Sequence, residues 1–419
     1  MTGPIDTNAD LEQVGHPADS RRDPEVVRVQ LQQWLTAKLG ASAEPTVDAV
    51  TVPTASGMSN DTILFDAEWS TLFDAEWSTL FDAEWSTLFD AEWSTDETRS
   101  THRLVARIAP ANTTLPVFPS YNLGRQFQVI RAVGSHSAVP VPAAYWCEPS
   151  SAALGAEFFV MERVDGDVPP DAMPYNFDSW LSQANSTDRA RLQDTSVRVL
   201  AQLHAIPEPQ QCFSFLLDEH TDGMKLTADQ ALRDHVAAQR RYYAWVIGDG
   251  PRSSLIERGF DWIESHWPTP AGPAVLCWGD ARIGNIIYSN FEPAAVLDWE
   301  MASFGPREMD LGWMIYLHRF FEDIAALAGL PGLPDFLRRD DVVKRYRELS
   351  SHRPTQLDFY TCYAALRHAI IMFRIQSRAV AFGLAQAPAD PNDLIMHRKA
   401  VEAMLAGTYW SGVDAGFGE

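Results

Sequence analysis

The stretch that most constrains the fold lies at residues 273–313, where two apolar runs each lead into polar residues. The first run is followed by Asp280 and, five residues later, by Asn285, and the second run delivers Asp298. Short apolar runs bounded by turn residues are typical of buried strands. The pattern therefore predicts a polar loop and a strand end, in series, that present two carboxylates and an amide.

These three side chains suit phosphoryl transfer, which depends mainly on positioning a hydroxyl nucleophile and neutralising charge with Mg²⁺. Asp280 can accept the proton of the hydroxyl, while the amide oxygen of Asn285 and the carboxylate of Asp298 are hard ligands of the kind that Mg²⁺ prefers. The alternative is a buried strand pair whose turn holds Asp and Asn, which are both common turn residues. The two strands with polar residues at these places favour a kinase-type site.

The sequences WGDARIGN, LDWE and MDLGW, in this order, resemble the aminoglycoside phosphotransferase family, which is similar to protein kinases in fold. The resemblance implies a two-lobed α+β protein-kinase-like fold, with a small antiparallel β-sheet lobe and a larger, mostly helical lobe. It also implies ATP or another nucleoside triphosphate with Mg²⁺, a small-molecule hydroxyl acceptor, and a role for Asp310 in bracing the catalytic loop. The alternative is that Asp310 has no such role and is an acidic residue in the first turn of a helix, where it interacts favourably with the helix dipole.

The family usually writes its loop as H-G-D-x4-N, whereas this chain has Trp278 at the position of the histidine. An indole N–H can donate a hydrogen bond but cannot accept one. We therefore expect Trp278 to support the loop in a different way from an imidazole. Another histidine, His204 near the end of a predicted helix, is expected to be a packed or loop-tying residue and not a base.

Residues 103–110, RLVARIAP, predict a strand that places Arg107 where protein kinases have the phosphate-binding lysine of V-A-I-K. No lysine occurs between Lys38 and Lys225, so a cation for the nucleotide phosphates in this part of the chain must be an arginine. Arginine can bind phosphate through two parallel hydrogen bonds. The alternative is an exposed arginine on an edge strand.

Three other stretches are candidates for contact with the nucleotide. The helix predicted at 121–133 has Gln126 where the kinase helix holds a glutamate, and Gln126 could hydrogen-bond Arg107 without supplying a counter-charge. The strand and hinge predicted at 157–171 would offer backbone groups of Met161 and Arg163 to an adenine edge, although a plain linker would look the same.

The turn at 54–65 is the third candidate, because glycine permits close backbone approach and backbone N–H groups can meet phosphate oxygens. A simple hairpin turn would have the same composition. Its candidate residues are Gly57, Ser59 and Asn60.

Residues 64–95 are four perfect copies of LFDAEWST. An even period of eight keeps each phenylalanine on one face of an extended strand, but the whole repeat would span roughly 105 Å when extended. One copy is enough for a hairpin between Thr62 and the strand at 103–108. The other copies, 3 × 8 = 24 residues, are given no function.

The chain has 419 residues, enough for two lobes, each with its own core. We expect a tail at 1–24, a nucleotide-binding lobe at 25–160 that contains the octamer repeat, a catalytic and acceptor-binding lobe at 161–406, and a tail at 407–419. The net charge of -23 argues against a nucleic-acid partner. It is compatible with a cationic acceptor, although solubility explains it equally well.

The chain shows no secretory signal pattern, and no apolar run approaches the length of a membrane span. Its four cysteines are scattered without disulfide or zinc spacing, which predicts a reduced, cytoplasmic protein. The second hypothesis for its function is a nucleotide-binding relative without transfer activity, motivated by Trp278, Arg107 and Gln126.

Overall fold

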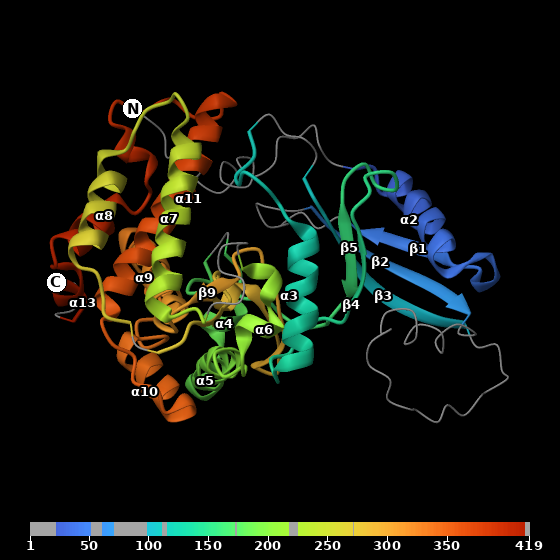
Figure 1. Cartoon of the computed structure of the whole chain (residues 1–419), viewed down its shortest axis with the longest axis horizontal. Helices are drawn as coiled ribbons and strands as arrows, with labels where there is room; N and C mark the ends of the chain where they lie inside the picture. The colour runs from blue at the N-terminus through green and yellow to red at the C-terminus, as the bar shows by residue number, and fades with distance from the viewer. Residues whose placement is uncertain are drawn as a thin grey trace. The chain divides into compact units, whose positions relative to one another are not determined.

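The computed structural model describes residues 22–51, 61–70, 99–110, 115–171, 174–217, 225–270 and 272–414. They form an α+β fold with a five-stranded antiparallel sheet and a larger helical part, which confirms the predicted fold class (Figure 1). The described residues fall into two compact units. The small unit is drawn from 18–113 and 143–163, and the large unit from 114–142 and 164–419.

The small unit is a sheet with the strand order β1-β2-β3-β5-β4 and one helix, α2. Its helix begins after the N-cap Asp23, whose side chain accepts from the amide of Glu25, and it ends at Gly40. Apolar side chains of α2 and of the sheet share one core. The elements are α2 (Pro24–Leu39), η2 (Ala41–Ala43), β1 (Thr46–Thr51), β2 (Asp61–Ser70), β3 (Arg99–Ile108), β4 (Ala144–Glu148) and β5 (Phe158–Glu162).

Strand β2 contains most of the first octamer copy and pairs with β3 along its whole length, from Asp61 opposite Ile108 to Ser70 opposite Arg99. Alternate residues of β2 are buried, so one face of the copy points into the core, as the even period requires. One copy thus forms the predicted hairpin strand. The other three copies lie outside the described residues.

Helix α3 (Leu123–His136) belongs to the large unit, although it lies within the predicted lobe 25–160. The segment before it is held by side chains of the large unit. Arg374 donates from Nε and Nη2 to the carbonyl of Pro116 at 2.9 and 2.6 Å, and the hydroxyl of Tyr242 donates to the carbonyl of Val117 at 3.0 Å. The boundary between the units later in the chain falls between Arg163 and Val164, inside the predicted hinge.

The large unit is built around α9 and α11, two long helices with mostly buried side chains that pack against each other. Gly312 of α9 allows this approach, because a Cβ there would lie 2.8 Å from the backbone carbonyl carbon of Tyr360 on α11. Helices α7 and α8 also contact α11 (Figure 1). The helices are α4 (Trp180–Gln183), α5 (Ser186–Leu203), α6 (Pro209–Cys212), η4 (Ser214–Leu216), α7 (Ala228–Ile247), α8 (Ser254–Ser265), α9 (Glu308–Leu327), α10 (Arg339–Ser350), α11 (Leu357–Ala381), η6 (Pro391–Leu394), α12 (Arg398–Leu405) and α13 (Tyr409–Asp414).

Two short sheets in the large unit hold the stretch that the sequence singles out. β6 (Val275–Cys277) pairs with β9 (Ser303–Gly305), and β7 (Ile286–Ser289) pairs with β8 (Glu292–Val296). The 3-10 turn η5 (Ile283–Asn285) leads into β7. Gly305 ends β9, and α9 begins three residues later at Glu308. Among the described residues, no helix has the length and apolar character to cross a membrane.

Candidate active site

The catalytic loop candidate, residues 278–285, contains η5 and joins β6 to β7, and Asp298 stands two residues after the end of β8. A backbone hydrogen bond connects these two segments, because the amide of Leu297 donates to the carbonyl of Asn285 at 2.8 Å. The fold therefore brings the loop of Asp280 and Asn285 next to the strand end of Asp298.

The carboxylate of Asp280 accepts hydrogen bonds on both oxygens. The indole N–H of Trp313 donates to Oδ1 at 2.7 Å. Oδ2 accepts from Nδ2 of Asn285 at 2.7 Å and from Nε of Arg282 at 3.0 Å. These three donors, from the loop itself and from α9, fix the orientation of the carboxylate.

The same contacts decide the charge of Asp280. Burial alone would raise the pKa of its carboxyl, but the positive charge of Arg282 and the hydrogen bonds from Arg282, Trp313 and Asn285 outweigh burial and lower that pKa. Asp280 is therefore ionised at neutral pH. An ionised, oriented carboxylate of this kind can accept a proton from a hydroxyl group.

Asn285 and Asp298 are the residues that could hold a metal ion. The amide nitrogen of Asn285 is committed to Asp280, with bonds to its carbonyl at 3.1 Å and to its carboxylate at 2.7 Å, which leaves the amide oxygen of Asn285 for another partner. Asp298 has a φ of 59°, a left-handed conformation that is uncommon for a residue other than glycine. An amide oxygen and a carboxylate on adjacent segments fit the preference of Mg²⁺ for hard oxygen ligands.

Trp278 links the catalytic loop to the segment of Asp298. Its indole N–H donates to the carbonyls of Leu297 at 2.9 Å and of Asp298 at 3.2 Å. Trp278 thus supports the loop by donating a hydrogen bond, which is the only type of hydrogen bond that an indole N–H can make. The ring also lies against Trp299, with a centroid distance of 5.8 Å.

Asp310 holds the backbone of the loop and is itself fully buried. Its carboxylate accepts from the amides of Trp278 at 2.8 Å and of Gly279 at 2.9 Å. His204 donates from Nε2 to Oδ2 of Asp310 at 3.1 Å and accepts at Nδ1 from the hydroxyl of Tyr346 at 2.8 Å. His204 is therefore a loop-tying residue that acts through Asp310.

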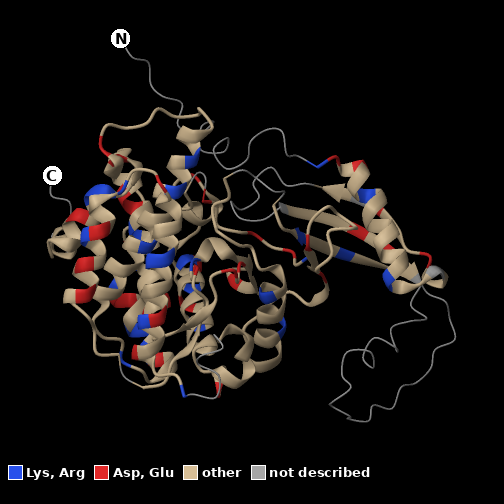
Figure 2. Cartoon of the chain, turned by 45° about the horizontal axis from the view of Figure 1, so that its top comes forward, with Lys and Arg blue, Asp and Glu red and all other residues tan. Residues whose placement is uncertain are grey.

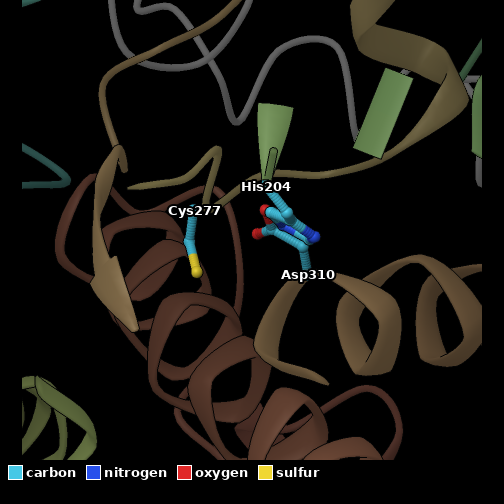
Figure 3. A group of neighbouring side chains, drawn as sticks. All are labelled: His204, Cys277 and Asp310. Carbon is cyan, nitrogen blue, oxygen red and sulfur yellow. The ribbon is translucent and has the colours of Figure 1, made fainter. Parts of the chain in front are cut away.

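Cys277 lies beside this pair, and the ligand-type atoms of Cys277, His204 and Asp310 lie within 4.8 Å of one another (Figure 3). Burial is the main cause that raises the pKa of the Cys277 thiol, with Asp310 adding to it, so the thiolate that a metal requires is disfavoured. Both ring nitrogens of His204 are also engaged. We interpret the cluster as a brace for the loop and not as a metal centre.

Gly279 lies between the brace and Asp280, with a φ of 91°. A Cβ at this position would lie 2.1 Å from the carbonyl oxygen of Met301, so only glycine fits. The carbonyl of Gly279 accepts from Nη2 of Arg367 on α11 at 3.1 Å. The loop is thus fastened at its N–H groups by α9 and at a carbonyl by α11.

Arg282 connects Asp280 to a second carboxylate. Its Nη1 forms an ion pair with Asp171, while its Nε contacts Asp280. Gly284 makes room for this pair, because a Cβ there would lie 2.6 Å from Oδ1 of Asp171. Asp171 and Arg282 line a small cavity together with Tyr175 and His318.

In the small unit, Arg107 lies on β3, which has paired strands on both sides. The alternative of an exposed arginine on an edge strand is therefore wrong, since Arg107 is partly buried on an interior strand. Leu104, Ala106 and Ile108 point into the core shared with α2, so the side chain of Arg107 is on the opposite face of the sheet.

The predicted hinge residues are already engaged within the small unit. The amide of Arg163 donates to the carbonyl of Arg103 at 2.9 Å, and its guanidinium pairs with Asp66 at 2.7 Å. This N–H group is therefore not available to an adenine edge, whereas the role of the other backbone groups of Arg163 stays a prediction. Met161 is buried in β5, paired with Val105 on one side and Ala144 on the other.

Gln126 is buried in α3, with 5% of its surface exposed. It belongs to the large unit, whereas Arg107 belongs to the small unit, so their pairing stays a prediction. The predicted phosphate-covering residues Gly57, Ser59 and Asn60 lie outside the described residues.

The sequence did not identify Trp313, Arg282 or Arg367 as site residues. A signal existed for Trp313, because it follows Asp310 by three positions and must share its helix face. Arg282 stands two residues after Asp280, which is close enough to contact it. Arg367 is far from the loop in sequence, and only the packing of α11 reveals its role.

Comparisons with known proteins identify the family and support the fold. A sequence profile of the phosphotransferase enzyme family matches residues 87–342. Among solved structures, a candidate aminoglycoside phosphotransferase of Ralstonia eutropha JMP134 aligns over 93% of this chain and 99% of its own, with a TM-score of 0.58 and 18% identity. Aminoglycoside phosphotransferase APH(2'')-Ib, solved with ADP, aligns over 93% of this chain and 99% of its own, with a TM-score of 0.50 and 12% identity.

A third similar structure is a thermostable mutant of aminoglycoside phosphotransferase APH(4)-Ia in a ternary complex with AMP-PNP and hygromycin B. It aligns over 92% of this chain and 99% of its own, with a TM-score of 0.50 and 13% identity. At these identities the three structures support the fold alone.

The curated relatives are longer proteins with other names. The Arabidopsis thaliana protein named "Probable acyl-CoA dehydrogenase IBR3" is 22% identical over 326 residues, which is 73% of this chain and 37% of that protein. Human acyl-CoA dehydrogenase family member 11 is 27% identical over 210 residues, 49% of this chain and 24% of that protein. The matched region therefore spans well under half the length of these relatives.

Proposed function

Because the chain belongs to the phosphotransferase enzyme family, we propose that it is a small-molecule phosphotransferase that moves the γ-phosphoryl group of ATP to a hydroxyl of its acceptor. The observation that carries this proposal is the setting of Asp280. Its carboxylate is oriented by Trp313, Asn285 and Arg282, and its loop is braced by Asp310. Such rigid positioning is what phosphoryl transfer requires from a protein.

In this proposal Asp280 orients the acceptor hydroxyl and takes its proton as the new oxygen–phosphorus bond forms, while the bond from the γ-phosphorus to the bridging oxygen breaks and ADP leaves. The lowered pKa of Asp280, in which Arg282 and three hydrogen bonds overcome burial, keeps the carboxylate ionised before transfer. Arg282 pairs with this carboxylate and with Asp171, which holds Asp280 in place. Trp278 and Asp310 support the loop through hydrogen bonds and do not themselves touch the reacting atoms.

Asn285 and Asp298 are proposed to hold Mg²⁺. Their oxygen donors and the backbone bond between their segments support this assignment. When bound, Mg²⁺ would neutralise the charge of the nucleotide phosphates.

For the nucleotide we propose ATP, with another nucleoside triphosphate as the alternative. Nucleotide complexes of the similar proteins support this choice, since one was solved with AMP-PNP and another with ADP. Arg107 is proposed to bind the phosphates and Gln126 to orient it. The backbone groups of Met161 and Arg163, except the N–H of Arg163, and the turn residues Gly57, Ser59 and Asn60 stay part of the same proposal.

The acceptor is proposed to be a small molecule with a free hydroxyl. Acidic and basic residues are interspersed along the helices of the large unit (Figure 2). A cationic acceptor, suggested by the net charge of -23, remains one candidate. A reduced, cytoplasmic setting is also part of the proposal, in keeping with four cysteines that form no disulfide.

The test is calorimetry of Mg²⁺-dependent ATP binding, run beside ATP consumption with aminoglycosides, sugar alcohols and hydroxyacyl thioesters as acceptors. Asp298→Ala should weaken Mg²⁺-linked binding about 100-fold, because a direct metal ligand is lost. Asp280→Asn should keep binding and lose transfer. Exposed Asp261→Ala on α8 is the control and should behave as the wild type. Wild-type protein without Mg²⁺-linked ATP binding would refute the proposal.

The second candidate is a nucleotide-binding protein without transfer activity. One observation favours it, namely that Arg282 occupies the carboxylate of Asp280 as an ion-pair partner. Full Mg²⁺-linked ATP binding without consumption on any acceptor, in the wild type and in Asp280→Asn alike, would support this candidate.

A further inference from the structure

Helix α11 carries three arginines on one face that are almost fully buried. Arg367, Arg374 and Arg378 expose only 1%, 9% and 5% of their surface. Spacings of seven and four residues place them on one stripe of a helix. Burying three cations in one stripe is costly unless each has a partner.

Two of the three arginines have such partners. Arg367 donates to the carbonyl of Gly279, and its guanidinium lies 4.3 Å from the ring centroid of Trp313. Arg374 donates twice to the carbonyl of Pro116 and lies 4.5 Å from the ring centroid of Trp245. These carbonyl and aromatic partners explain why Arg367 and Arg374 can be buried.

Arg378 has no such partner. Its guanidinium makes no hydrogen bond or ion pair with any other residue that the structure describes, and its Nε is fully buried. The nearest aromatic contact is Phe382, at 5.9 Å from the ring centroid.

The charges around Arg374 and Arg378 do not compensate them. Burial is the main cause that lowers the pKa of both groups, and the charge of Arg378 lowers the pKa of Arg374 further. The groups that act in the opposite direction are the hydroxyls of Tyr121 and Tyr242, and no described carboxylate acts on either arginine. Two like charges one helical turn apart thus share a site that lacks an anion.

We propose that Arg374 and Arg378 form a subsite for an anionic group, a carboxylate or a phosphate, of the acceptor. The guanidinium fork of Arg378 matches the oxygens of both groups, and burial strengthens such a contact. Tyr121 accepts from the amides of Val117 and Phe118, which leaves its hydroxyl hydrogen as a further donor.

The position of the subsite defines the shape of the acceptor. Arg374 and Arg378 follow Arg367 by seven and eleven residues, or about 10 and 16 Å along the helix. Arg367 contacts the catalytic loop at Gly279. An acceptor with its hydroxyl at Asp280 would therefore be elongated, with its anionic group about 10 to 16 Å away. The subsite is argued from α11 alone, whereas its assignment to the acceptor rests on the proposed function.

The test uses inorganic phosphate as the probe on the full chain, with binding measured by calorimetry and by the shift of the melting temperature. Arg378→Gln should weaken phosphate binding about 10-fold, the loss of one charge-assisted hydrogen bond. Arg378→Lys should retain part of it. Arg258→Gln, at an exposed arginine of α8, is the matched control and should change nothing.

Stability in phosphate-free buffer separates this role from a structural one. Arg378→Gln should melt at or above the temperature of the wild type, because an unpaired buried charge is removed. A lower melting temperature with an unchanged response to phosphate would mean that Arg378 serves only packing, and would overturn the proposal. Equal phosphate affinity of the wild type and Arg378→Gln would also overturn it.

Saturation with AMP-PNP distinguishes the two sources of the anion. Phosphate that binds equally well in its presence has a site apart from the nucleotide, as an acceptor subsite requires. Phosphate that AMP-PNP displaces occupies a nucleotide phosphate site, which overturns the assignment to the acceptor. Because no readout depends on transfer, a protein that binds phosphate through Arg378 but consumes no ATP would refute the proposed function and not the subsite.

Discussion

The indole N–H of Trp313 donates to Oδ1 of Asp280 at 2.7 Å. Three residues earlier on the same helix, Asp310 accepts from the amides of Trp278 and Gly279. One face of α9 therefore holds both the carboxylate and the backbone of the loop that carries it. Helix α9 therefore makes a large contribution to the position of Asp280, beside the contacts from the loop itself and from α11.

Trp313→Phe tests this relationship, because it keeps an aromatic ring and removes the donor. The hydrogen bond from Trp313 lowers the pKa of Asp280, so its loss should raise that pKa. We expect the acid limb of the kcat/KM profile to move to higher pH, and kcat at neutral pH to fall about 10-fold. The pH dependence of phosphate transfer measures both effects.

The control for this variant is Trp267→Phe. The indole of Trp267 donates to Oδ1 of Asp229 at 2.8 Å, which is the same type of bond on another part of the unit. It should leave the profile unchanged. Superimposable profiles for Trp313→Phe and the wild type would contradict the role given to Trp313.

Gly279→Ala is expected to lower the free energy of unfolding by more than the strain of its backbone angle alone. The left-handed φ of 91° costs about 1–2 kcal/mol with a Cβ, and the contact with Met301 at 2.1 Å adds about 1–3 kcal/mol through displacement of the backbone. Urea unfolding should therefore show a loss of about 3 kcal/mol, together with loss of transfer.

Gly383→Ala separates the two contributions. Gly383 has a similar φ of 74°, but a Cβ there would meet nothing within 4 Å. Its loss of unfolding free energy should be about 1 kcal/mol, from the backbone angle alone. Equal losses for the two variants would show that the loop can move away from Met301.

The sequence predicted the parts of the site that are local in the chain. Asp280, Asn285 and Asp298 lie within 19 residues, and the strands around them follow from two apolar runs. The bracing of the catalytic loop by Asp310 could also be predicted, because the family resemblance implies this role for the aspartate of MDLGW. The roles in catalysis and metal binding stay predictions.

The long-range contacts could not be predicted from the sequence, because they depend on how the helices pack. Arg367 donates to Gly279 across 88 positions of the chain. Arg374 holds Pro116 across 258 positions, which fixes the segment before α3 to the large unit. The amide of Arg163, one of the backbone groups proposed to face a nucleotide, is used instead in the pairing with Arg103. Neither helix packing nor register follows from local pattern.

Deletion of residues 72–95 should preserve the sheet. Ser70 and Arg99 are paired, and after the deletion only Thr71 and residues 96–98 would join them, a four-residue hairpin connection. A connection shortened from 28 to four residues costs less closure entropy, so the free energy of unfolding should rise by about 1–2 kcal/mol. Urea unfolding and ATP binding measure the outcome.

The contrasting variant deletes all four copies, residues 64–95, and with them most of β2. It should lose the cooperative unfolding of the small unit, because β2 joins β1 to β3. A large destabilisation by the 24-residue deletion would instead show that the extra copies contribute to the fold.

Acid should destabilise the protein through its buried histidines. Burial lowers the pKa of His397 to about 4 and of His318 to about 3, and it also lowers the pKa of His235 and His368. In the unfolded chain each histidine binds a proton near pH 6.5, whereas the folded protein keeps it neutral. The stabilisation is therefore present above pH 6.5 and is lost as the pH falls below it.

Between pH 7 and pH 5 each of these histidines should remove about 2 kcal/mol from the free energy of unfolding. Urea unfolding at pH 7, 6 and 5 measures how steeply the free energy of unfolding depends on pH. His397→Gln should reduce this slope by the contribution of one histidine. Exposed His266→Gln should keep the wild-type slope, because it changes no buried group. A free energy of unfolding that stays constant from pH 7 to pH 5 would mean that the buried histidines find compensating partners when they are protonated.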